Sequence, residues 1–461
     1  MKLPLQKLIV IADPHYYSKT LGITGRAYQL RSESDQKCLG ESEEIVDAAF
    51  AEIAKSDCDA VLIAGDLTDN GERVCHEEFR AKLYELQKTK PVYVITATHD
   101  WCCDKNPRRF EGENVYHDVP VLNHDELRDF YKDFGPEKAD SEFFTHLGTS
   151  SYAVNLSDKV KILCLNDDQS GMGGAGFSEE HFRWIEAQLA DAKKKGMTVI
   201  SMQHHLLLDH IHPMISGGGM SVKDERTVSA RLADAGLKFS FVGHSHMTDT
   251  AKITTEKGNT LYEVNVGSIC GYPAPMAEVT VYEDEITVQM HYLKSFFDVD
   301  NAQEFLKEHA LNLINKTLQG VAYGSKKEFV DRITAMQGNG EKMLKYRPLL
   351  KPAAKIIDKL TVKKAVTILN TLFFGTAVRK KDAEPYYDEK VMDIAKEIFL
   401  NIFDGCRHPH PESSEYFRLV TSVISLPQRF AKQNKVLKQI PELVQILITG
   451  TELNQYPVNL K

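Results

Sequence analysis

The sequence predicts an α/β domain over residues 1–300, followed by an all-α domain over residues 301–461. In the first part, short apolar segments alternate with amphipathic ones, and the short segments are apolar on both faces, as in buried parallel strands. Beyond Asn301 the strand signals stop, and long helical patterns broken by prolines take their place. A chain of 461 residues fits this division, since domains average roughly 150 residues.

The predicted strands are short and rich in Val and Ile. Six read as buried strands, at Leu8–Ala12, Ala60–Ala64, Val92–Thr96, Val160–Leu165, Thr198–Met202 and Phe239–Val242. Three more indicate a more antiparallel sheet, at Leu261–Val266, Glu278–Tyr282 and Ile286–Met290. Helices are predicted at Glu43–Lys55, which has one apolar face, and at Ser178–Lys195, which starts at a capping serine and ends before Gly196. Two polar insertions, Tyr16–Gly40 and Asp104–Thr149, interrupt the alternation at strand ends, where insertions often shape substrate sites.

Composition excludes several classes of protein. The chain has 56 Lys and Arg against 65 Asp and Glu, a net charge of −9, which argues against broad binding of nucleic acid. No apolar run reaches the roughly 18–20 residues that span a bilayer, and the first residues lack the layout of a signal peptide. The eight cysteines form no C-x-x-C pair, which indicates reduced thiols. We therefore expect a cytoplasmic protein.

Polar residues follow five of the predicted strands. The segments are Asp13-Pro14-His15, Gly65-Asp66, Ala97-Thr98-His99-Asp100, Gln203-His204-His205 and Gly243-His244-Ser245-His246. In an α/β sheet the carboxyl ends of the strands meet at one crevice, so these residues are expected to share one site. Carboxylates and imidazoles are ligands typical of Mn, Fe or Zn, and the sequence therefore predicts a metal site there.

The ordered set of motifs resembles the calcineurin-like metallophosphoesterase superfamily over roughly residues 6–290. The Gly-Asp-Leu-Thr-Asp-Asn-Gly-Glu segment and the Ser178–Leu189 helix are most similar to bacterial phosphodiesterases of the cyclic-nucleotide branch, some of which carry a helical C-terminal domain. The resemblance implies a four-layer α/β/β/α sandwich with two transition-metal ions, Mn, Fe or Zn. By position, the first ion would be bound by Asp13, His15, Asp66 and His246, and Asp66 would bridge to a second ion bound by Thr98, His204 and His244.

One ligand position departs from the family pattern. The family motif G-N-H-D reads Ala97-Thr98-His99-Asp100 here, so a threonine hydroxyl stands where an asparagine carbonyl normally binds the second metal. We expect weaker binding of the second ion, or a water or nearby side chain that completes its coordination. The alternative is a protein that has lost activity.

The resemblance also implies the mechanism and the other site residues. Two metal ions would activate a hydroxide that attacks phosphorus in line, with His99 as general acid or phosphoryl clamp. Asp69 would orient His99, with Asp100 as its competitor for that role. Asn70 stands where the protein-phosphatase branch has a phosphate-binding arginine, which favours diesters over the more anionic monoesters. His205 is predicted to contact substrate or, alternatively, to support a metal ligand.

Three functions follow from these residues. The first is a binuclear-metal phosphodiesterase for cyclic nucleotides or other small phosphodiesters. The second is a phosphomonoesterase or nucleotide pyrophosphatase on the same fold, which the ligand motifs do not separate from the first. The third is a catalytically silent module that binds phosphates or a partner. The motifs do not indicate an oligomeric state.

The predicted helical domain contains a strongly basic segment. Lys342–Lys381 holds eleven Lys and Arg and one acidic residue, Asp358, a net charge of +10. It predicts a docked helix with solvated lysines, a contact with an anionic membrane surface, or an electrostatic funnel toward the metal site.

Overall fold

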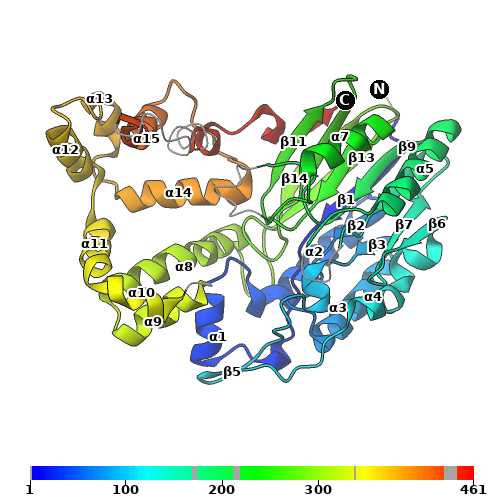
Figure 1. Cartoon of the computed structure of the whole chain (residues 1–461), viewed down its shortest axis with the longest axis horizontal. Helices are drawn as coiled ribbons and strands as arrows, with labels where there is room; N and C mark the ends of the chain where they lie inside the picture. Colours follow the sequence, from blue (N-terminus) through cyan, green and yellow to red (C-terminus); the bar gives the residue numbers. More distant parts are fainter. Residues whose placement is uncertain (1–2, 169–173, 211–218, 337–338, 430–443) are drawn as a thin grey trace. The chain divides into compact units, whose positions relative to one another are not determined.

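A computed structural model describes residues 3–168, 174–210, 219–336, 339–429 and 444–461, which divide into two compact units (Figure 1). The sheet unit comprises Met1–Ser32, Lys37–Lys307 and Tyr456–Lys461, and the helical unit comprises Glu33–Gln36 and Glu308–Gln455. The sheet unit holds two mixed sheets with helices packed on them, and the helical unit is all-α. The predicted fold class, an α/β sandwich with an all-α C-terminal region, is confirmed.

The first sheet has six strands in the order β15-β14-β13-β1-β2-β3. Strands β1 (Gln6–Ile11), β2 (Ala60–Ala64) and β3 (Val92–Ile95) are parallel, and β13 (Pro275–Val281), β14 (Ile286–Tyr292) and β15 (Val458–Leu460) add antiparallel. Every residue of β2 is buried, as its continuous apolar sequence predicts. Helix α2 (Ser42–Lys55) buries one apolar face, and α3 (Arg73–Gln87) packs beside it.

The second sheet has seven strands in the order β11-β12-β10-β9-β8-β7-β6. Its centre, β8 (Val160–Cys164), β9 (Thr198–Met202), β10 (Phe239–Val242) and β12 (Thr260–Asn265), is parallel, and its edges, β6 (Ser141–Phe144), β7 (Ser150–Asn155) and β11 (Asp249–Thr254), are antiparallel. Helices α5 (Glu179–Lys195) and α7 (Glu225–Ala235) share an apolar core with this sheet. The predicted caps of α5 are confirmed, because Ser178 accepts a hydrogen bond from the His181 amide and Gly196 ends the helix in the left-handed conformation.

The two polar insertions pack against each other. The first contains α1 (Gly25–Ser32), and the second contains β4 (Arg109–Glu111), β5 (Asn114–Tyr116) and α4 (His124–Phe130). The Ala27 amide donates to the Gly112 carbonyl at 3.0 Å, and the rings of Tyr28 and Phe110 lie 5.7 Å apart. The first insertion is thereby held in a defined path beside the carboxyl end of β1.

The helical unit is built from short helices around two small apolar clusters. Helix α8 (Ala302–Tyr323) leads into it, followed by α9 (Lys326–Ala335), α10 (Gly340–Met343), α11 (Arg347–Lys359), α12 (Val362–Leu372), α13 (Lys380–Ala383), α14 (Val391–Asp404) and α15 (Glu415–Ile424). None of the described helices is both long enough and apolar enough to cross a bilayer. All eight cysteines are free thiols.

Candidate metal centre

Two groups of side chains that could hold metal ions lie at the carboxyl ends of parallel strands. In the first, donor atoms of Asp13, His15 and His246 all lie within 4.8 Å of one another. Its shortest distance joins His15 Nε2 to His246 Nε2, at 2.9 Å. In the second, donor atoms of Asp66, His204 and His244 lie within the same distance. The convergence predicted from the strand ends is therefore present, although it joins the ends of two sheets rather than of one.

Asp66 lies between the two groups. Its Oδ2 atom is 3.1 Å from His204 Nε2 in the second group and 3.9 Å from His15 Nε2 in the first. Its side chain is buried, and its other oxygen accepts a hydrogen bond from the His99 amide at 3.0 Å. A carboxylate in this position can bind two metal ions at once.

The backbone around these residues is strained. Five of the six side chains in the two groups come from residues with a positive φ: Asp13 at 51°, His15 at 41°, Asp66 at 47°, His244 at 67° and His246 at 58°. Residues other than glycine rarely adopt this conformation, which costs on the order of 1–3 kcal/mol and concentrates at functional sites. These residues come shortly after their strands, and this backbone conformation turns the polypeptide there so that each side chain joins one of the two groups of donor atoms.

Two glycines let the strand ends approach closely enough to build the site. A Cβ atom at Gly65 would lie 2.6 Å from His204 Nδ1, and one at Gly243 would lie 2.4 Å from Asp13 Oδ2. Both distances are too short for any side chain. The glycines of the G-D and G-H-x-H motifs are therefore required by packing against the ligand residues themselves.

The chemistry of these donors fits metal ions. His204 Nδ1 donates to the Ala64 carbonyl at 2.9 Å, which directs Nε2 toward Asp66 and toward His244 Nδ1 at 3.2 Å. Burial lowers the pKa of His15 and of His244 well below the usual value, so both are neutral and present lone pairs. Burial opposes a charge on His204, yet the carboxylates of Asp66 and Asp13 hold its pKa well above the usual value. The pocket thus favours a positive charge, and its nitrogen and oxygen donors suit Mn, Fe or Zn.

His99 stands at the open side of this cluster. Its side chain is 35% exposed, and Nε2 lies 4.0 Å from Asp66 Oδ2. Nδ1 donates a hydrogen bond to the backbone carbonyl of Asp69, which leaves Nε2 directed at the site. The contact expected between His99 and Asp69 therefore exists, but it runs through the Asp69 backbone rather than its carboxylate.

The carboxylate of Asp69 instead holds two cations from the first insertion. Lys37 Nζ lies 3.0 Å and an Arg31 guanidinium nitrogen 3.2 Å from Asp69 Oδ1. Burial opposes ionisation, but Lys37 and then Arg31 hold the pKa of Asp69 at about 2. A carboxylate oxygen of Asp69 also lies within 4.8 Å of donor nitrogens on His15 and His99, so the cations stand beside the cluster.

Asp100 supports the loops of the site. Its carboxylate accepts hydrogen bonds from the Ala97 amide at 2.9 Å and from the Thr68 amide at 3.0 Å. Burial, and then the charge of Asp66, raise the pKa of Asp100 to about 7. These bonds tie the loop after β3 to the loop after β2, and thus position His99 from its backbone side. Among the hydrogen bonds of the described residues, none joins the Asp100 carboxylate to the His99 ring.

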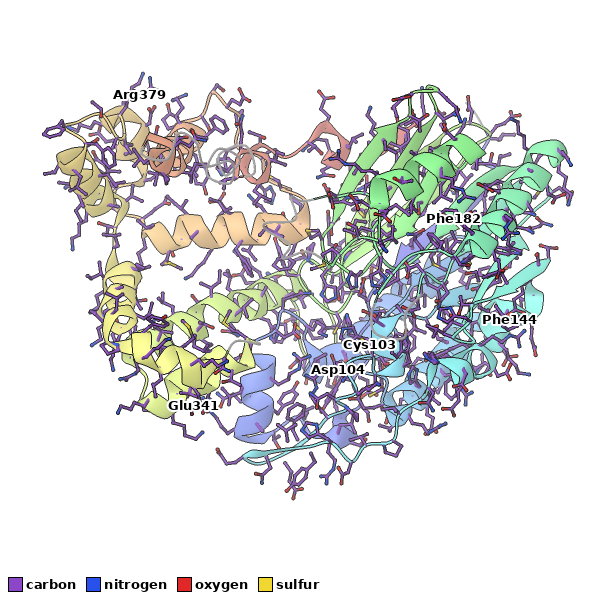
Figure 2. The ribbon with its side chains drawn as sticks, viewed as in Figure 1. Cys103, Asp104, Phe144, Phe182, Glu341 and Arg379 are labelled. Atoms are coloured by element: carbon purple, nitrogen blue, oxygen red, sulfur yellow. The ribbon has the colours of Figure 1, made fainter. Side chains whose placement is uncertain are left out.

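The remaining predicted residues lie around the cluster. Thr98 is buried at the start of the 3-10 helix Thr98–Trp101, directly before His99. Its role as a ligand stays a prediction. Asn70 donates through its amide to Asp104 Oδ1 at 3.1 Å and to the Asn106 carbonyl at 2.9 Å, so the amide is engaged with the loop that contains Asp104, labelled in Figure 2.

His205 is buried against a ligand. Its ring centroid lies 4.1 Å from that of His244, and its Nδ1 lies 2.9 Å from Asp167 Oδ1. Asp167 also accepts from the His205 amide at 2.8 Å. Of the two roles left open by the sequence, this geometry favours support of a metal ligand over contact with substrate.

Sequence reasoning missed four residues of the site region: Lys37, Arg31, Asp167 and Asp168. The two aspartates follow β8, one of the predicted strands, so the rule used for the other strand ends would have found them. Donor atoms of Asp167, Asp168 and His205 lie within 4.8 Å of one another. No comparable signal marks Lys37 and Arg31, because they come from a polar insertion that contains other basic residues.

Similar solved structures include a dimetal phosphatase from Danio rerio, with 13% identity over 63% of this chain and 97% of that one and a TM-score of 0.42. A purple acid phosphatase from yellow lupin (Lupinus luteus) seeds has 12% identity over 62% of this chain and 51% of that one, with a TM-score of 0.40. A putative 5'-nucleotidase from Staphylococcus aureus has 10% identity over 68% of this chain and 58% of that one, with a TM-score of 0.35. No curated protein matches the sequence significantly.

The family model of calcineurin-like phosphoesterases matches residues 6–248. The match spans more than half of the chain and includes every residue of the two ligand groups. This protein belongs to the calcineurin-like phosphoesterase family.

Proposed function

We propose that this protein is a binuclear metal-dependent phosphodiesterase that hydrolyses small phosphodiesters, such as cyclic nucleotides. The observation that carries the proposal is the position of Asp66 between two groups of ligands, with His99 at their open side. Two groups of donors that could each hold a cation, with a titratable group beside them, are what metal-assisted phosphoester hydrolysis requires.

Asp13, His15, Asp66 and His246 would hold one ion, and Asp66, His204 and His244 would hold the other. Thr98 is proposed as a further ligand of the second ion. Two such ions supply positive charge for the phosphoryl oxygens and make water a better nucleophile near neutral pH.

His99 would stabilise the leaving group. Its Nδ1 proton is committed to the Asp69 carbonyl, so Nε2 can donate a proton or a hydrogen bond to the departing oxygen only in the imidazolium form, which carries a second proton on Nε2. Burial lowers the pKa of His99, whereas the charge of Asp66 favours the imidazolium. The partial exposure of the ring gives a substrate access to Nε2 from solvent. Asp100 would act through His99, by holding the backbone from which the imidazole projects.

The charge balance beside His99 supports a diester. Lys37 and Arg31 bring two positive charges, and the ionised Asp69 removes one, which leaves a net charge of about +1 for the trio. A phosphodiester carries one negative charge near neutral pH, whereas a monoester carries nearly two, with a second pKa of about 6. The amide of Asn70 adds no charge to this trio.

The deciding experiment compares two generic substrates with the metal-loaded protein. With Mn²⁺ present, kcat/KM for bis(p-nitrophenyl) phosphate should exceed that for p-nitrophenyl phosphate by at least about tenfold, a difference of ~1.4 kcal/mol. The His99→Ala variant should lose most of the activity toward both. A preference for the monoester would instead indicate a phosphomonoesterase or nucleotide pyrophosphatase. Absence of turnover in a protein that demonstrably binds Mn²⁺ would indicate a phosphate-binding module.

A further inference from the structure

Large apolar side chains are exposed in one segment of the helical unit. Of the fifteen such residues exposed in the described part of the chain, seven lie within Lys342–Lys381, here called the basic segment. They are Tyr346, Leu349, Ile356, Ile357, Ile368, Leu372 and Phe374. The segment contains α11 and α12 and runs from the end of α10 into the start of α13. Glu341, directly before it, and Arg379, near its end, are labelled in Figure 2. Scattered apolar residues are ordinary on a protein surface, but such a concentration indicates an interaction site.

Helix α11 presents a stripe of these side chains to solvent. Leu349 is 71% exposed and Ile356 is 63% exposed, seven residues apart and therefore on the same side of the helix. Pro352 and Ala353 lie between them at the matching spacing and are exposed as well. Ala354 is the one residue of α11 that is buried.

The polar side of α11 is the side that packs. Arg347 and Lys351 donate to the carbonyl of Gly324, just beyond the end of α8, at 2.8 and 3.3 Å. Asp358 accepts hydrogen bonds from Gln319 and Tyr323 of α8 at 3.1 and 2.8 Å. An amphipathic helix of a globular protein normally packs with its apolar stripe inward, and α11 does the reverse. The apolar stripe is thus available for a partner.

Helix α12 and the turn after it expose further large apolar side chains. Val362 and Val366 anchor α12 in an apolar cluster of the helical unit, while Ile368 and Leu372, one turn apart, are 52% and 66% exposed. Phe374 follows in the turn and is 95% exposed. Its φ of +52° is a conformation that bulky residues rarely adopt, so the turn holds a phenylalanine outward at the cost of backbone strain.

The positive charge of the basic segment favours a negatively charged partner. Its eleven Lys and Arg against one Asp give a net charge of +10, although Arg347 and Lys351 lie on the side of α11 that packs. In a symmetric dimer the same patch would face itself, and the like charges would repel. An anionic bilayer offers negative headgroups to the lysines and acyl chains to the apolar residues at the same surface.

We propose that the basic segment binds the surface of an anionic phospholipid bilayer, with Leu349, Ile356 and Phe374 inserted among the lipids. The protein would lie on the membrane rather than span it, in keeping with the absence of a spanning helix among the described residues. This binding does not depend on the proposed function of the metal centre, because every residue involved belongs to the helical unit.

Co-sedimentation of the full chain with vesicles tests the proposal. Binding to mixed phosphatidylcholine and phosphatidylserine vesicles should exceed binding to pure phosphatidylcholine vesicles by at least about tenfold and should weaken as salt is added. The Leu349→Ser/Ile356→Ser/Phe374→Ser variant should lose at least about tenfold in affinity for the mixed vesicles, because three apolar side chains no longer insert. Phe297→Ser, at a 74% exposed position of the sheet unit, is the matched control and should bind like the parent.

A second pair of variants tests the charge. Lys363→Glu/Lys364→Glu reverses two charges in the first turn of α12, where acidic residues do not harm a helix. It should lower the affinity by at least about tenfold, whereas Lys326→Glu/Lys327→Glu, in the first turn of α9 outside the basic segment, should have little effect. Hydrolysis of a soluble aryl phosphodiester should be unchanged in all four variants.

Three results would overturn the proposal. One is equal binding of the parent to pure phosphatidylcholine and mixed vesicles, or binding to neither. Another is a set of basic-segment variants that bind like their controls. The third is a concentration-dependent dimer in solution that the triple serine variant abolishes, which would make the surface a contact between copies of this chain.

Discussion

Lys37 Nζ donates to Asp69 Oδ1 at 3.0 Å, and both side chains are buried beside the predicted ligand His15 and the predicted acid His99. A buried ion pair is costly to form, since both charges lose water. This ion pair lies at the edge of the site, where the Lys37 ammonium group could also donate a hydrogen bond to a phosphate oxygen of the substrate.

Replacing Lys37 with methionine should therefore weaken substrate binding. We expect Lys37→Met to raise KM for an aryl phosphodiester by about 10- to 100-fold with a smaller change in kcat, the loss of one charge-assisted hydrogen bond worth ~1.5–3 kcal/mol. Lys19→Met, in the same insertion but paired with Glu44, is the control and should leave KM unchanged. Steady-state kinetics of both variants would show it, and an unchanged KM in Lys37→Met would exclude a role in binding.

The sequence predicts that the side chains of the two groups in the candidate metal centre converge, and there is a physical reason for it. Strands buried on both faces are continuous apolar runs, so their ends are visible in the sequence, and sheet geometry brings these ends together. Asp13, Asp66, His204 and His244 could be found this way without knowledge of their neighbours.

The residues that the sequence does not reveal are those placed by tertiary packing. Lys37 and Arg31 reach Asp69 because the first insertion is folded against the second, and no local pattern encodes that path. Similarly, the periodicity of α11 predicts an amphipathic helix but not which side packs, and the apolar side is the one left outside. Strand β15 has only three residues, too few for a pattern.

Replacement of His99 with alanine should lower the rate of hydrolysis without lowering the metal content of the protein. His99→Ala should lower kcat by about 10²- to 10⁴-fold, the range for loss of a general acid, because Nε2 is the ring nitrogen that would donate to the leaving group once Nδ1 is bound to the Asp69 carbonyl. Metal content, measured by elemental analysis of the purified variant, should equal that of the parent. A variant that lost its metals would show instead that His99 is needed to hold them.

Metal ions should stabilise the sheet unit. Because the ligand groups are preformed only in the folded chain, binding is expected to raise the free energy of unfolding by ~2.7 kcal/mol at a metal concentration of 100 times Kd. Thermal unfolding with Mn²⁺ and with a chelator should show this difference for the parent. Asp66→Asn, which removes the shared carboxylate charge, should abolish most of it, and an equal metal effect in that variant would refute the bridging position of Asp66.

Thr98 provides a test specific to the second ion. Thr98→Asn should increase affinity at the weaker of two Mn²⁺ sites by about tenfold, since an amide carbonyl is a better metal ligand than a neutral hydroxyl. Isothermal titration of the metal-free protein would resolve the two binding steps. If neither step tightens, Thr98 does not limit the second site.

His210 makes the stability of the sheet unit depend on pH. Its imidazole is fully buried, with Nδ1 2.8 Å from Asp249 Oδ2 and Nε2 2.9 Å from Glu263 Oε1. Burial opposes its charge, but the hydrogen bonds to Asp249 and Glu263 raise the pKa of His210 from 6.5 to about 9. A raised pKa in the folded chain means that the protonated form stabilises the fold. The contribution is complete below pH 6.5 and is lost as the pH rises through about 9.

The free energy of unfolding should therefore fall by up to ~3 kcal/mol across that window. Urea unfolding at a series of pH values measures the fall. His210→Gln should be less stable than the parent at the acidic end and should show a smaller fall across the window, because an amide does not titrate while His204, whose pKa is also raised, still does. A variant that keeps the parent's slope would assign the pH dependence to other groups. His291→Gln, at a 53% exposed histidine paired with Glu278, is the matched control and should leave the slope intact, since an exposed pair contributes little.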